Sequence, residues 1–318
     1  MSPDPAPAEL TIIIVSYNTR ALTLKCLETL YAQTREARFR TVVFDNASED
    51  GSAEAIAAAF PQVDLIAHPE NLGFAQANNV VAAQADTEWL LLLNPDTEVH
   101  DGAVDKLLAF ARAHPEAGIT GGRTVFPDGS LNIASCWNRI TPWSAFCMAT
   151  GLTAAFRNTV LFNPEGIGGW KRDSVRKVDL VVGCFLMIPR ALWNDLGGFD
   201  AKYFMYGEEA DLCLRAAKLG YQPMITPEAE IMHLVGASSG KVAHKVVRVA
   251  KSRATLIRDH WPAWQVPFGL AMLWLWGALR VTAARAMALS GTAKGREAAE
   301  KWRHIWAGRR DWLGGYEA

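Results

Sequence analysis

The sequence has little cysteine and no paired cysteine motif. Five cysteines are scattered over 318 residues, and no two of them have the C-x-x-C spacing of zinc and redox sites. An odd number without a pattern argues against a disulfide framework and favours core thiols in a reduced, cytosolic protein. Residues 1–9 are rich in Pro and Ala and lack a basic stretch followed by an apolar core. We therefore expect a disordered N-terminus and no export signal.

The sequence also lacks a long uninterrupted hydrophobic run. The uncharged stretch Trp261–Leu279 contains two prolines, and its longest proline-free part, Phe268–Leu279, has twelve residues. A membrane-spanning helix needs about 20 apolar residues. We therefore expect a helix that lies at a membrane surface rather than one that crosses the membrane.

Charge is unevenly distributed along the chain. Residues 1–240 hold 18 Lys and Arg against 28 Asp and Glu, whereas residues 241–318 hold 14 against 5 and seven of the twelve tryptophans. Because Trp favours the membrane–water boundary, we predict a basic, Trp-rich helical tail on the inner membrane surface. The alternative is packing on the catalytic body or on a second subunit, as a homodimer. The acidic body argues against a nucleic-acid binder.

Short apolar runs alternate with helical periodicity over residues 10–93. Leu10–Val15 is rich in β-branched residues, as in a parallel strand buried on both faces. The pattern predicts strands at residues 10–15, 41–44, 63–67 and 89–93, with helices at residues 20–33, 52–60 and 74–85. Such alternation indicates an α/β fold with a doubly wound, mostly parallel sheet. We expect a nucleotide-binding half at residues 10–96, an acceptor half at 97–240 and the tail at 241–318.

The acceptor half is less regular. Helices are expected at residues 101–113, 191–196 and 209–219, and a single strand at Val178–Pro189. Residues 120–180 are rich in Gly, Pro, Asn and Trp. This composition is typical of a long functional loop or lid, which we expect to shape the substrate pocket.

Polar side chains follow the first two predicted strands. Ser16, Tyr17 and Asn18 end the first strand, and Asp45 ends the second. Neighbouring strand ends face one crevice in a doubly wound sheet. Asp45 could accept the N3–H of a uracil or thymine ring there, with Tyr17 covering the ring. The alternative is that Asp45 only shapes the turn that follows it.

The third predicted helix opens with Asn71, Gly73 and Asn79. Glycine permits a close backbone approach, and the N–H groups of a helix N-terminus suit a phosphate or a sugar. Capping alone explains such residues equally well.

Asp96, in Asn94-Pro95-Asp96, directly follows the apolar run Trp89–Leu93. Mg²⁺ often takes only one or two protein carboxylates together with substrate phosphates. Asp96 is thus a candidate metal ligand, and a helix-capping aspartate is the alternative. His233 could complete the metal shell or bond a phosphate oxygen, although a lone histidine is more often structural.

A second acidic cluster contains Glu208, Glu209 and Asp211. Like charges this close raise at least one pKa, which suits a general base. Acids at an exposed helix N-terminus are the alternative. The aromatic-rich approach at residues 197–206 favours a buried, functional setting.

Together these motifs resemble the family 2 glycosyltransferases of the GT-A fold, in particular a bacterial rhamnosyltransferase-like branch. The matching elements occur in family order and at family spacing: Val15–Asn18, Asp45–Ser52, Asn71–Phe74 with Asn79, Asn94–Asp96, Gly197–Asp200, Glu208–Arg215, and His233 with Gly236.

The resemblance implies an inverting transferase that uses a dTDP- or UDP-linked sugar and a divalent metal, Mg²⁺ or Mn²⁺. It implies a base at Glu209, with Glu208 as the alternative because the family's Glu-Asp pair is Glu-Glu here. The other expected roles are donor binding by Ser16, Tyr17, Asn18, Asp45, Asn71, Gly73, Asn79 and Asn94, metal binding by Asp96 and His233, and acceptor-side contacts by Asp200, Tyr206 and Asp211.

The expected reaction is transfer of rhamnose to a polyprenyl-diphosphate-linked saccharide in cell-envelope polysaccharide synthesis, at the inner face of the membrane. Alternatives are another sugar, such as galactofuranose or a hexose, and a non-catalytic membrane-associated scaffold. A nucleotidyltransferase would need a glycine-rich loop after the first strand, which Val15–Arg20 lacks. The intact acids at positions 96 and 208–211 argue against a scaffold.

Overall fold

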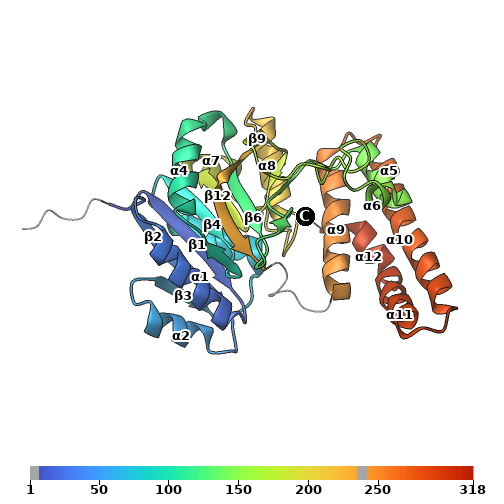
Figure 1. Cartoon of the computed structure of the whole chain (residues 1–318), viewed down its shortest axis with the longest axis horizontal. Helices are drawn as coiled ribbons and strands as arrows, with labels where there is room; N and C mark the ends of the chain where they lie inside the picture. Colours follow the sequence, from blue (N-terminus) through green and yellow to red (C-terminus); the bar gives the residue numbers. More distant parts are fainter. Residues whose placement is uncertain (1–6, 235–241, 318) are drawn as a thin grey trace, which may run out of the picture. The chain divides into compact units, whose positions relative to one another are not determined.

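The structure is a computed structural model that describes residues 7–234 and 242–317 (Figure 1). Its contacts divide the chain into two compact units. The sheet unit comprises Met1–Trp137, Lys171–Phe204 and Glu208–Ser238, and the helical unit comprises Asn138–Trp170, Met205–Gly207 and Ser239–Ala318. The predicted disordered N-terminus falls mostly outside the described residues, as does Gly236. Glu9, the last residue of that predicted segment, is fixed by ion pairs with Arg38 and Arg112 at 3.1 and 2.9 Å.

The sheet unit is built on a ten-stranded mixed sheet with strand order β3-β2-β1-β4-β11-β6-β12-β5. Its first part is parallel: β1 (Leu10–Ser16), β2 (Phe39–Asn46), β3 (Asp64–His68) and β4 (Trp89–Leu93). The second part contains β5 (Thr97–Val99), β6 (Thr120–Val125), β7 (Leu131–Asn132), β9 (Arg176–Lys177), β11 (Phe185–Pro189) and β12 (Met224–His233). Strand β11 runs antiparallel to β4 and β6. This arrangement confirms the predicted mostly parallel α/β sheet.

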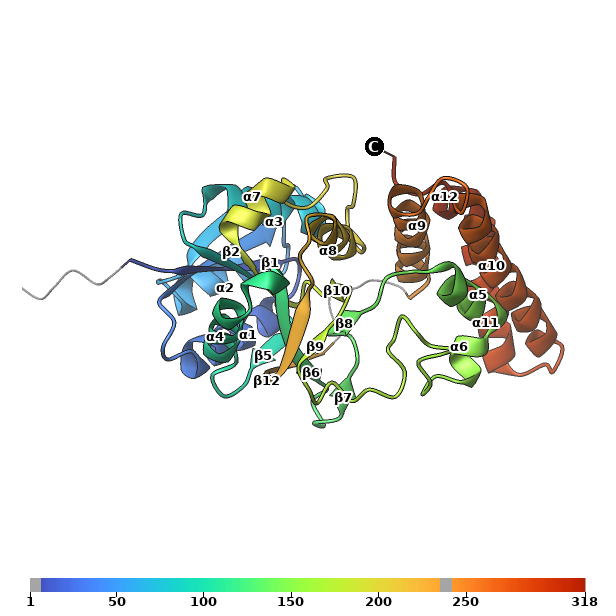
Figure 2. The same cartoon turned by 90° about the horizontal axis from the view of Figure 1, so that it is seen from above.

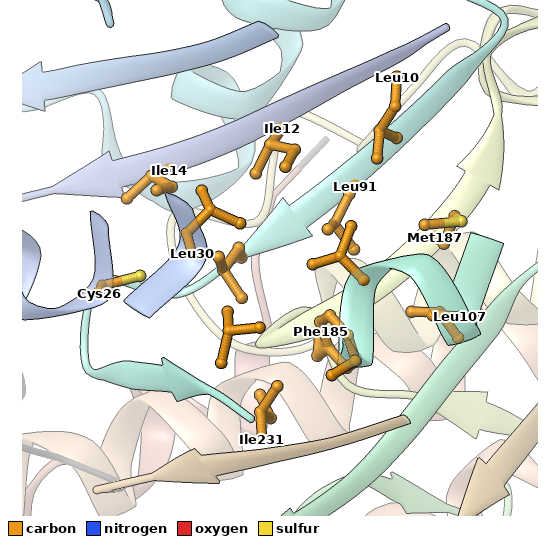
Figure 3. Packing of buried hydrophobic residues seen from close by; sticks show 14 of the residues in the cluster. Leu10, Ile12, Ile14, Cys26, Leu30, Leu91, Leu107, Phe185, Met187 and Ile231 are labelled. Atoms are coloured by element: carbon orange, nitrogen blue, oxygen red, sulfur yellow. The ribbon is translucent and has the colours of Figure 1, made fainter. Parts of the chain in front are cut away.

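Helices cover the sheet as the apolar periodicity predicts. They are α1 (Arg20–Gln33), α2 (Ser52–Ala59), α3 (Gly73–Gln84), α4 (Ala103–Ala113), α7 (Arg190–Leu196) and α8 (Glu208–Lys218), with a 3-10 turn η1 (Pro115–Ala117) after α4. In the core, alternate side chains of β1 and β4, such as Ile12 and Leu91, pack in one cluster with Leu30 of α1 and Leu107 of α4 (Figure 3). Burial of these aliphatic side chains stabilises the sheet, and the sheet fixes the positions of the residues at the carboxyl ends of its strands.

The strand predicted at Val178–Pro189 is broken in two. Leu180–Val181 forms β10, which pairs with β8 (Cys136–Trp137) in a separate two-stranded sheet, whereas Phe185–Pro189 joins the main sheet as β11. Residues 182–184 turn between the two sheets. This break leaves Gly183 and Cys184 beside the end of β4, where the Cys184 carbonyl accepts a hydrogen bond from Asn94 N at 3.1 Å.

The helical unit combines the C-terminal helices with a distant segment. Its helices are α5 (Pro142–Thr150), α6 (Leu152–Ala155), α9 (Val242–His260), α10 (Val266–Ala288), α11 (Ala293–Ala307) and α12 (Arg309–Gly314). Arg253 of α9 forms a bidentate pair with Glu165, at 2.7 and 2.9 Å. Residues 138–170 therefore belong structurally with the tail, although our predicted boundary at residue 240 assigns them to the acceptor half. Residues 120–180 are accordingly divided between the two units, and their role in shaping the substrate pocket stays a prediction.

Helix α10 corrects the predicted length of the apolar helix. It runs for 23 residues rather than twelve and is long and apolar enough, by length and composition alone, to cross a membrane. Pro267 does not interrupt it because proline is compatible with the first helical turn, whose N–H groups need no intrahelical partner. The helix also continues past Arg280, whose guanidinium lies 5.1 Å from the Trp276 ring centroid.

The N-terminus of α3 is in close contact with the loop before α8. Gly73 has a φ of +76°, and a Cβ at this position would collide with the carbonyl oxygen of Phe204. Phe74 N donates a 3.0 Å hydrogen bond to the same carbonyl. Gly73 thus lets the loop that leads to the acidic cluster approach α3.

We expect Gly73→Ala to lower the free energy of unfolding by roughly 2–4 kcal/mol, because it adds a collision to the cost of a left-handed backbone. Gly197→Ala is the matched control: Gly197 has a φ of +73° but open space around its Cβ position, so only about 1 kcal/mol should be lost. Chemical denaturation measures both values. Equal losses for the two variants would contradict the close approach of Phe204.

Candidate active site

The ends of β1 and β2 bring Tyr17 and Asp45 to the same edge of the sheet. Their strands are in parallel register, with Ser16 opposite Asp45. The Tyr17 side chain is 44% exposed, whereas Asp45 is buried. Asp45 Oδ2 accepts a 3.1 Å hydrogen bond from Ser48 N, and its Oδ1 has no hydrogen-bond partner among the described residues. Asp45 therefore both shapes the turn and keeps one acceptor atom for a ligand.

Two neighbouring side chains are engaged within the protein. The Ser16 hydroxyl is fully buried and lies 3.0 and 3.1 Å from those of Thr19 and Thr23. Asn18 adopts a φ of 53°, and its Oδ1 accepts a 2.8 Å hydrogen bond from Glu49 N. Both side chains hold the loop after β1, so their predicted donor contacts remain predictions.

Asn46 organises the loop that contains Asn71. Its amide Nδ2 donates to Asn71 Oδ1 at 3.0 Å and to the Gly73 carbonyl at 3.1 Å, and its Oδ1 accepts from Leu72 N at 2.7 Å. Asn71 and Gly73 are thereby fixed in the loop that opens α3. Sequence reasoning did not identify Asn46 as the centre of this network, although its place after β2 was a signal.

Asn79 connects α3 to the glycine-rich corner after α7. Its Nδ2 donates to the Phe199 carbonyl at 2.8 Å, and its Oδ1 accepts from Phe199 N at 2.9 Å. Both polar ends of the amide are therefore used inside the protein. Asn79 positions the corner, and a direct contact with a donor remains a prediction.

Asp96 and His233 are brought together by strand pairing. Thr97 of β5 is opposite His233 of β12, and Leu234 N donates a 3.1 Å hydrogen bond to the Asp96 carbonyl. His233 Nε2 lies 3.4 Å from Asp96 Oδ1, and both side chains are buried. Burial lowers the pKa of His233, but the adjacent Cys184 and Asp96 raise it more, to about 10. Without a bound cation, the protonated form of the imidazole is thus favoured beside the carboxylate, whereas metal binding needs the neutral form.

The pair suits a divalent cation. Asp96 Oδ1 and His233 Nδ1 are buried atoms without hydrogen-bond partners in the described part of the chain. A carboxylate is a suitable ligand for Mn²⁺ or Mg²⁺, which accept substrate phosphates and water in the remaining positions, whereas an imidazole is preferred by softer divalent metals. Within residues 7–234 and 242–317, no three His, Cys, Asp or Glu side chains converge as a complete metal site. Asp96 and His233 alone could therefore supply only part of a coordination shell.

The acidic cluster lies on the other side of the β10–β11 break. A Cβ at Gly183 would be 4.0 Å from Glu209 Cβ, while the next residue, Cys184, is adjacent to His233. The two residues Gly183 and Cys184 thus connect the Asp96–His233 pair to the start of α8. Sequence reasoning missed them, because Val178–Pro189 has the pattern of one uninterrupted strand.

The two glutamates differ in environment. Glu208 is buried, and desolvation together with the charge of Glu209 raises its pKa well above 4.5. Glu209 is only partly buried. Burial thus favours the protonated form of Glu208, and which of the two glutamates serves as the base stays a prediction.

The remaining acidic residues have visible structural partners. Asp211 is buried and accepts a 2.7 Å hydrogen bond from Arg215 Nε, and Arg215 also donates to the Gly198 carbonyl at 2.8 Å. Asp200 is paired with Lys202 at 3.1 Å. Asp211 therefore holds the Gly197-Gly198 corner through Arg215, and the acceptor-side roles of Asp200 and Asp211 stay predictions.

Tyr206 and Asn94 complete the set of predicted site residues. Tyr206 belongs to the helical unit, where the Lys245 ammonium lies 5.7 Å from its ring centroid. Asn94 ends β4 and contributes backbone contacts, since its carbonyl accepts a 2.7 Å hydrogen bond from the Thr97 hydroxyl. Their acceptor-side and donor-side roles stay predictions.

This fold and site define an enzyme class: an α/β transferase with a buried Asp–His pair at the carboxyl edge of the sheet and an acidic pair at the start of a neighbouring helix. The family described as glycosyl transferase family 2 matches residues 11–179, and the chain belongs to this family.

The chain is similar to characterised and solved proteins over most of its length. It is 27% identical to an N-acetylglucosaminyl-diphospho-decaprenol L-rhamnosyltransferase of Mycobacterium tuberculosis, with 81% of this chain and 87% of the relative covered. It is 26% identical to rhamnosyltransferase WbbL of Escherichia coli K12, with 70% and 82% covered. Its fold resembles that of a Pyrobaculum calidifontis mannosyltransferase solved with GDP-Man and Mn²⁺, at a TM-score of 0.58, 20% identity, and 98% and 89% coverage.

The buried Glu208 gives a pH-dependent stability prediction. Its pKa is raised in the folded protein, so the unfolded chain loses its proton first as the pH rises above about 4.5, and folding becomes less favourable. Glu208→Gln removes this ionisation. We expect the variant to gain stability over the wild type as the pH rises from about 5 to about 8, by about 1 kcal/mol or more, since one pKa unit corresponds to about 1.4 kcal/mol.

Denaturant unfolding at the two pH values measures the difference. Glu36→Gln, at an exposed position of the same unit, is the control and should show no such trend. A Glu208→Gln advantage that is constant with pH would refute the raised pKa.

Proposed function

We propose that this chain is an inverting glycosyltransferase that moves rhamnose from a dTDP-linked donor to a polyprenyl-diphosphate-linked saccharide. The observation that carries the proposal is the arrangement around Gly183 and Cys184, where the Asp96–His233 pair and Glu209 approach adjacent residues of one loop. The mycobacterial relative, an N-acetylglucosaminyl-diphospho-decaprenol L-rhamnosyltransferase, supports rhamnose as the sugar and a lipid diphosphate as the acceptor carrier. Such a reaction belongs to cell-envelope polysaccharide synthesis.

The edge formed by β1 and β2 is the proposed base-binding site. The unpartnered Oδ1 of Asp45 can accept the N3–H of thymine or uracil, and the exposed Tyr17 ring can stack on the base. Both nucleobases present this N–H, so the contacts suit a dTDP- or a UDP-linked donor. The diphosphate would then extend toward Asp96.

In the proposed reaction, Glu209 accepts the proton of an acceptor hydroxyl. The hydroxyl oxygen attacks the anomeric carbon from the face opposite the diphosphate, forming the new glycosidic bond while the bond to the diphosphate oxygen breaks. The nucleoside diphosphate leaves with that electron pair, and the configuration at the anomeric carbon inverts. Glu208, protonated beside Glu209, limits the negative charge of the acidic pair.

Asp96 and His233 would hold a divalent cation, Mn²⁺ or Mg²⁺, which supplies Lewis-acid stabilisation of charge on the departing diphosphate. The protein residues contribute a buried carboxylate and an imidazole whose backbone positions are fixed by the β5–β12 pairing. The Asn132 side chain donates a 3.2 Å hydrogen bond to the His233 carbonyl and helps to fix that strand end.

We propose that the enzyme works at the cytoplasmic face of the cell membrane. A lipid-linked acceptor is confined to the membrane, and the basic residues of 241–318 complement an anionic leaflet, at about 1 kcal/mol for each Lys or Arg near the surface. Helix α10 has the length and apolar composition of a membrane helix, and only 22% of its most apolar window is buried inside the protein.

One assay distinguishes the proposed rhamnosyltransferase from two alternatives, a transferase of another sugar and a non-catalytic scaffold. A panel of nucleotide sugars distinguishes rhamnose from galactofuranose or a hexose by the donor that is consumed. A non-catalytic scaffold would consume none of them. We therefore expect metal-dependent turnover of dTDP-rhamnose in the presence of a lipid-linked acceptor.

Glu209→Gln should reduce kcat by about 10²–10⁴-fold, because it removes the proposed general base. Donor affinity should stay near that of the wild type. Glu208→Gln is the matched variant, and it should retain most activity. The measurement is rhamnose transfer under saturating donor, with donor binding followed by calorimetry. Full activity of Glu209→Gln together with loss in Glu208→Gln would reassign the base.

Asp96→Asn should weaken Mn²⁺ binding by at least about tenfold, because an amide lacks the charge of the carboxylate ligand. His233→Gln should have a smaller effect in the same direction. Mn²⁺ titration followed by electron paramagnetic resonance, in the presence of the nucleoside diphosphate, measures binding without catalysis. Asp200→Asn, at a partly exposed acid paired with Lys202, is the control. Unchanged binding in Asp96→Asn would remove Asp96 from the metal site.

A further inference from the structure

An exposed apolar patch lies on α5 and on the segment that follows α6. The patch consists of Trp143, Phe146, Phe156, Val160, Leu161 and Phe162. Phe156 is 48% exposed, Val160 52% and Leu161 62%. Trp143 is also exposed, while Phe146 and Phe162 are partly buried, and so large a group of exposed apolar side chains is unusual for a soluble surface without a partner.

The side chains of the patch contact one another. The ring centroids of Trp143 and Phe146 are 5.6 Å apart, and those of Phe156 and Phe162 are 4.9 Å apart. Trp143 Nε1 donates a 2.6 Å hydrogen bond to the Leu161 carbonyl. The protein therefore holds these side chains together at the surface instead of burying them.

The backbone behind the patch is also fixed. The Asn163 side chain donates a 2.9 Å hydrogen bond to the Arg157 carbonyl, and the Thr153 hydroxyl donates one of 2.9 Å to the Phe162 carbonyl. Gly168 packs so closely that a Cβ would collide with the Thr159 carbonyl oxygen. These contacts thus fix the backbone that presents the patch at the surface.

The patch is anchored to the C-terminal helices of the same unit. Besides the Arg253–Glu165 pair, Trp261 Nε1 donates a 3.0 Å hydrogen bond to the Ile140 carbonyl, and Arg280 Nη2 donates one of 3.2 Å to the Met148 carbonyl. Helix α5 packs beside α10 in both views (Figures 1 and 2). The patch is therefore part of the packed helical unit.

Charge complementarity indicates what the patch contacts. The helical unit holds 16 Lys and Arg against 6 Asp and Glu over its three segments. Two of those six acids are neutralised inside the unit, Glu165 by Arg253 and Asp311 by Lys251 at 2.7 Å. Exposed Arg157 lies between the apolar residues of the patch itself. Two strongly basic units repel each other, which disfavours a second copy as the partner and favours an anionic lipid surface.

We propose that the patch on residues 143–162 inserts into an anionic membrane leaflet and acts as a docking element in addition to the C-terminal helices. This inference rests on the proposed function, because it assigns the contact with the membrane that carries the acceptor. Aromatic and aliphatic side chains enter the interfacial region, and the surrounding Arg and Lys contact lipid phosphates. The docking surface is therefore assembled from two segments that are about a hundred residues apart in the sequence.

The test is vesicle co-sedimentation of the full chain with phosphatidylcholine vesicles that contain or lack phosphatidylglycerol. We expect the double variant Phe156→Ser with Leu161→Ser to reduce partitioning onto anionic vesicles by at least about tenfold, since two partly exposed apolar side chains lose their insertion. Leu219→Ser is the matched control, because Leu219 is 59% exposed but lies on the sheet unit. It should partition like the wild type. Val160→Trp should partition more strongly than the wild type.

Two results would overturn the inference. One is unchanged partitioning of both the double variant and Val160→Trp. The other is a fall in the molar mass of the double variant by light scattering, which would assign the patch to contact between copies. Rhamnose transfer to a short-chain, water-soluble acceptor is measured on the same samples and should be equal in all variants. Absence of transfer in the wild type with intact vesicle binding would contradict the transferase proposal and leave the docking element supported.

Discussion

The antiparallel pairing of β5 with β12 is the constraint on which the active-site arrangement depends. It sets Thr97 opposite His233 and so fixes Asp96 and His233 as neighbours, although 137 positions separate them in the sequence. Two buried polar groups this close are stable together only with balanced charge, and the raised pKa of His233 acts in that direction. A bound cation would provide the same balance. The pairing thus explains why a charged pair occupies an otherwise apolar part of the sheet.

The β10–β11 break extends this arrangement to the acidic cluster. If Val178–Pro189 continued as one strand, Gly183 would lie within a ladder rather than beside Glu209. The small residue at position 183 leaves space between Phe74 and Glu209, and Cys184 reaches the Asp96–His233 pair. The two glutamates differ in burial, and desolvation raises the pKa of the more buried one, Glu208. The Asp96–His233 pair and Glu209 are consequently arranged around one short turn.

Much of the nucleotide-binding half could be predicted from the sequence. Strands buried on both faces, such as Leu10–Val15 and Trp89–Leu93, are continuous apolar runs, and the intervening helices have clear periodicity. Strand β5 was missed because three residues carry no periodicity. Strand β12 was missed because Pro227 and Glu228 interrupt it where its register against β6 shifts. The position of residues 138–170 could not be predicted, because it depends on the Arg253–Glu165 pair, whose partners are 88 residues apart.

The predicted site residues divide in the same way. Tyr17, Asp45, Asp96 and Glu209 were predicted because each lies where a strand ends or a helix begins, and their roles in the site stay predictions. Ser16, Asn79 and Asp211 share the same motifs but are occupied by hydrogen bonds that hold the loops. Sequence motifs do not distinguish these two kinds of residue, because both are needed at the same positions.

The most direct test of the account is a crystal structure with Mn²⁺ and a nucleotide sugar, using the anomalous signal of manganese. The account predicts a manganese peak bonded to Asp96 and His233 and to the donor diphosphate, with the Glu209 carboxylate on the opposite side of the sugar. A manganese peak bonded to other residues, or a sugar bound away from Glu209, would contradict it.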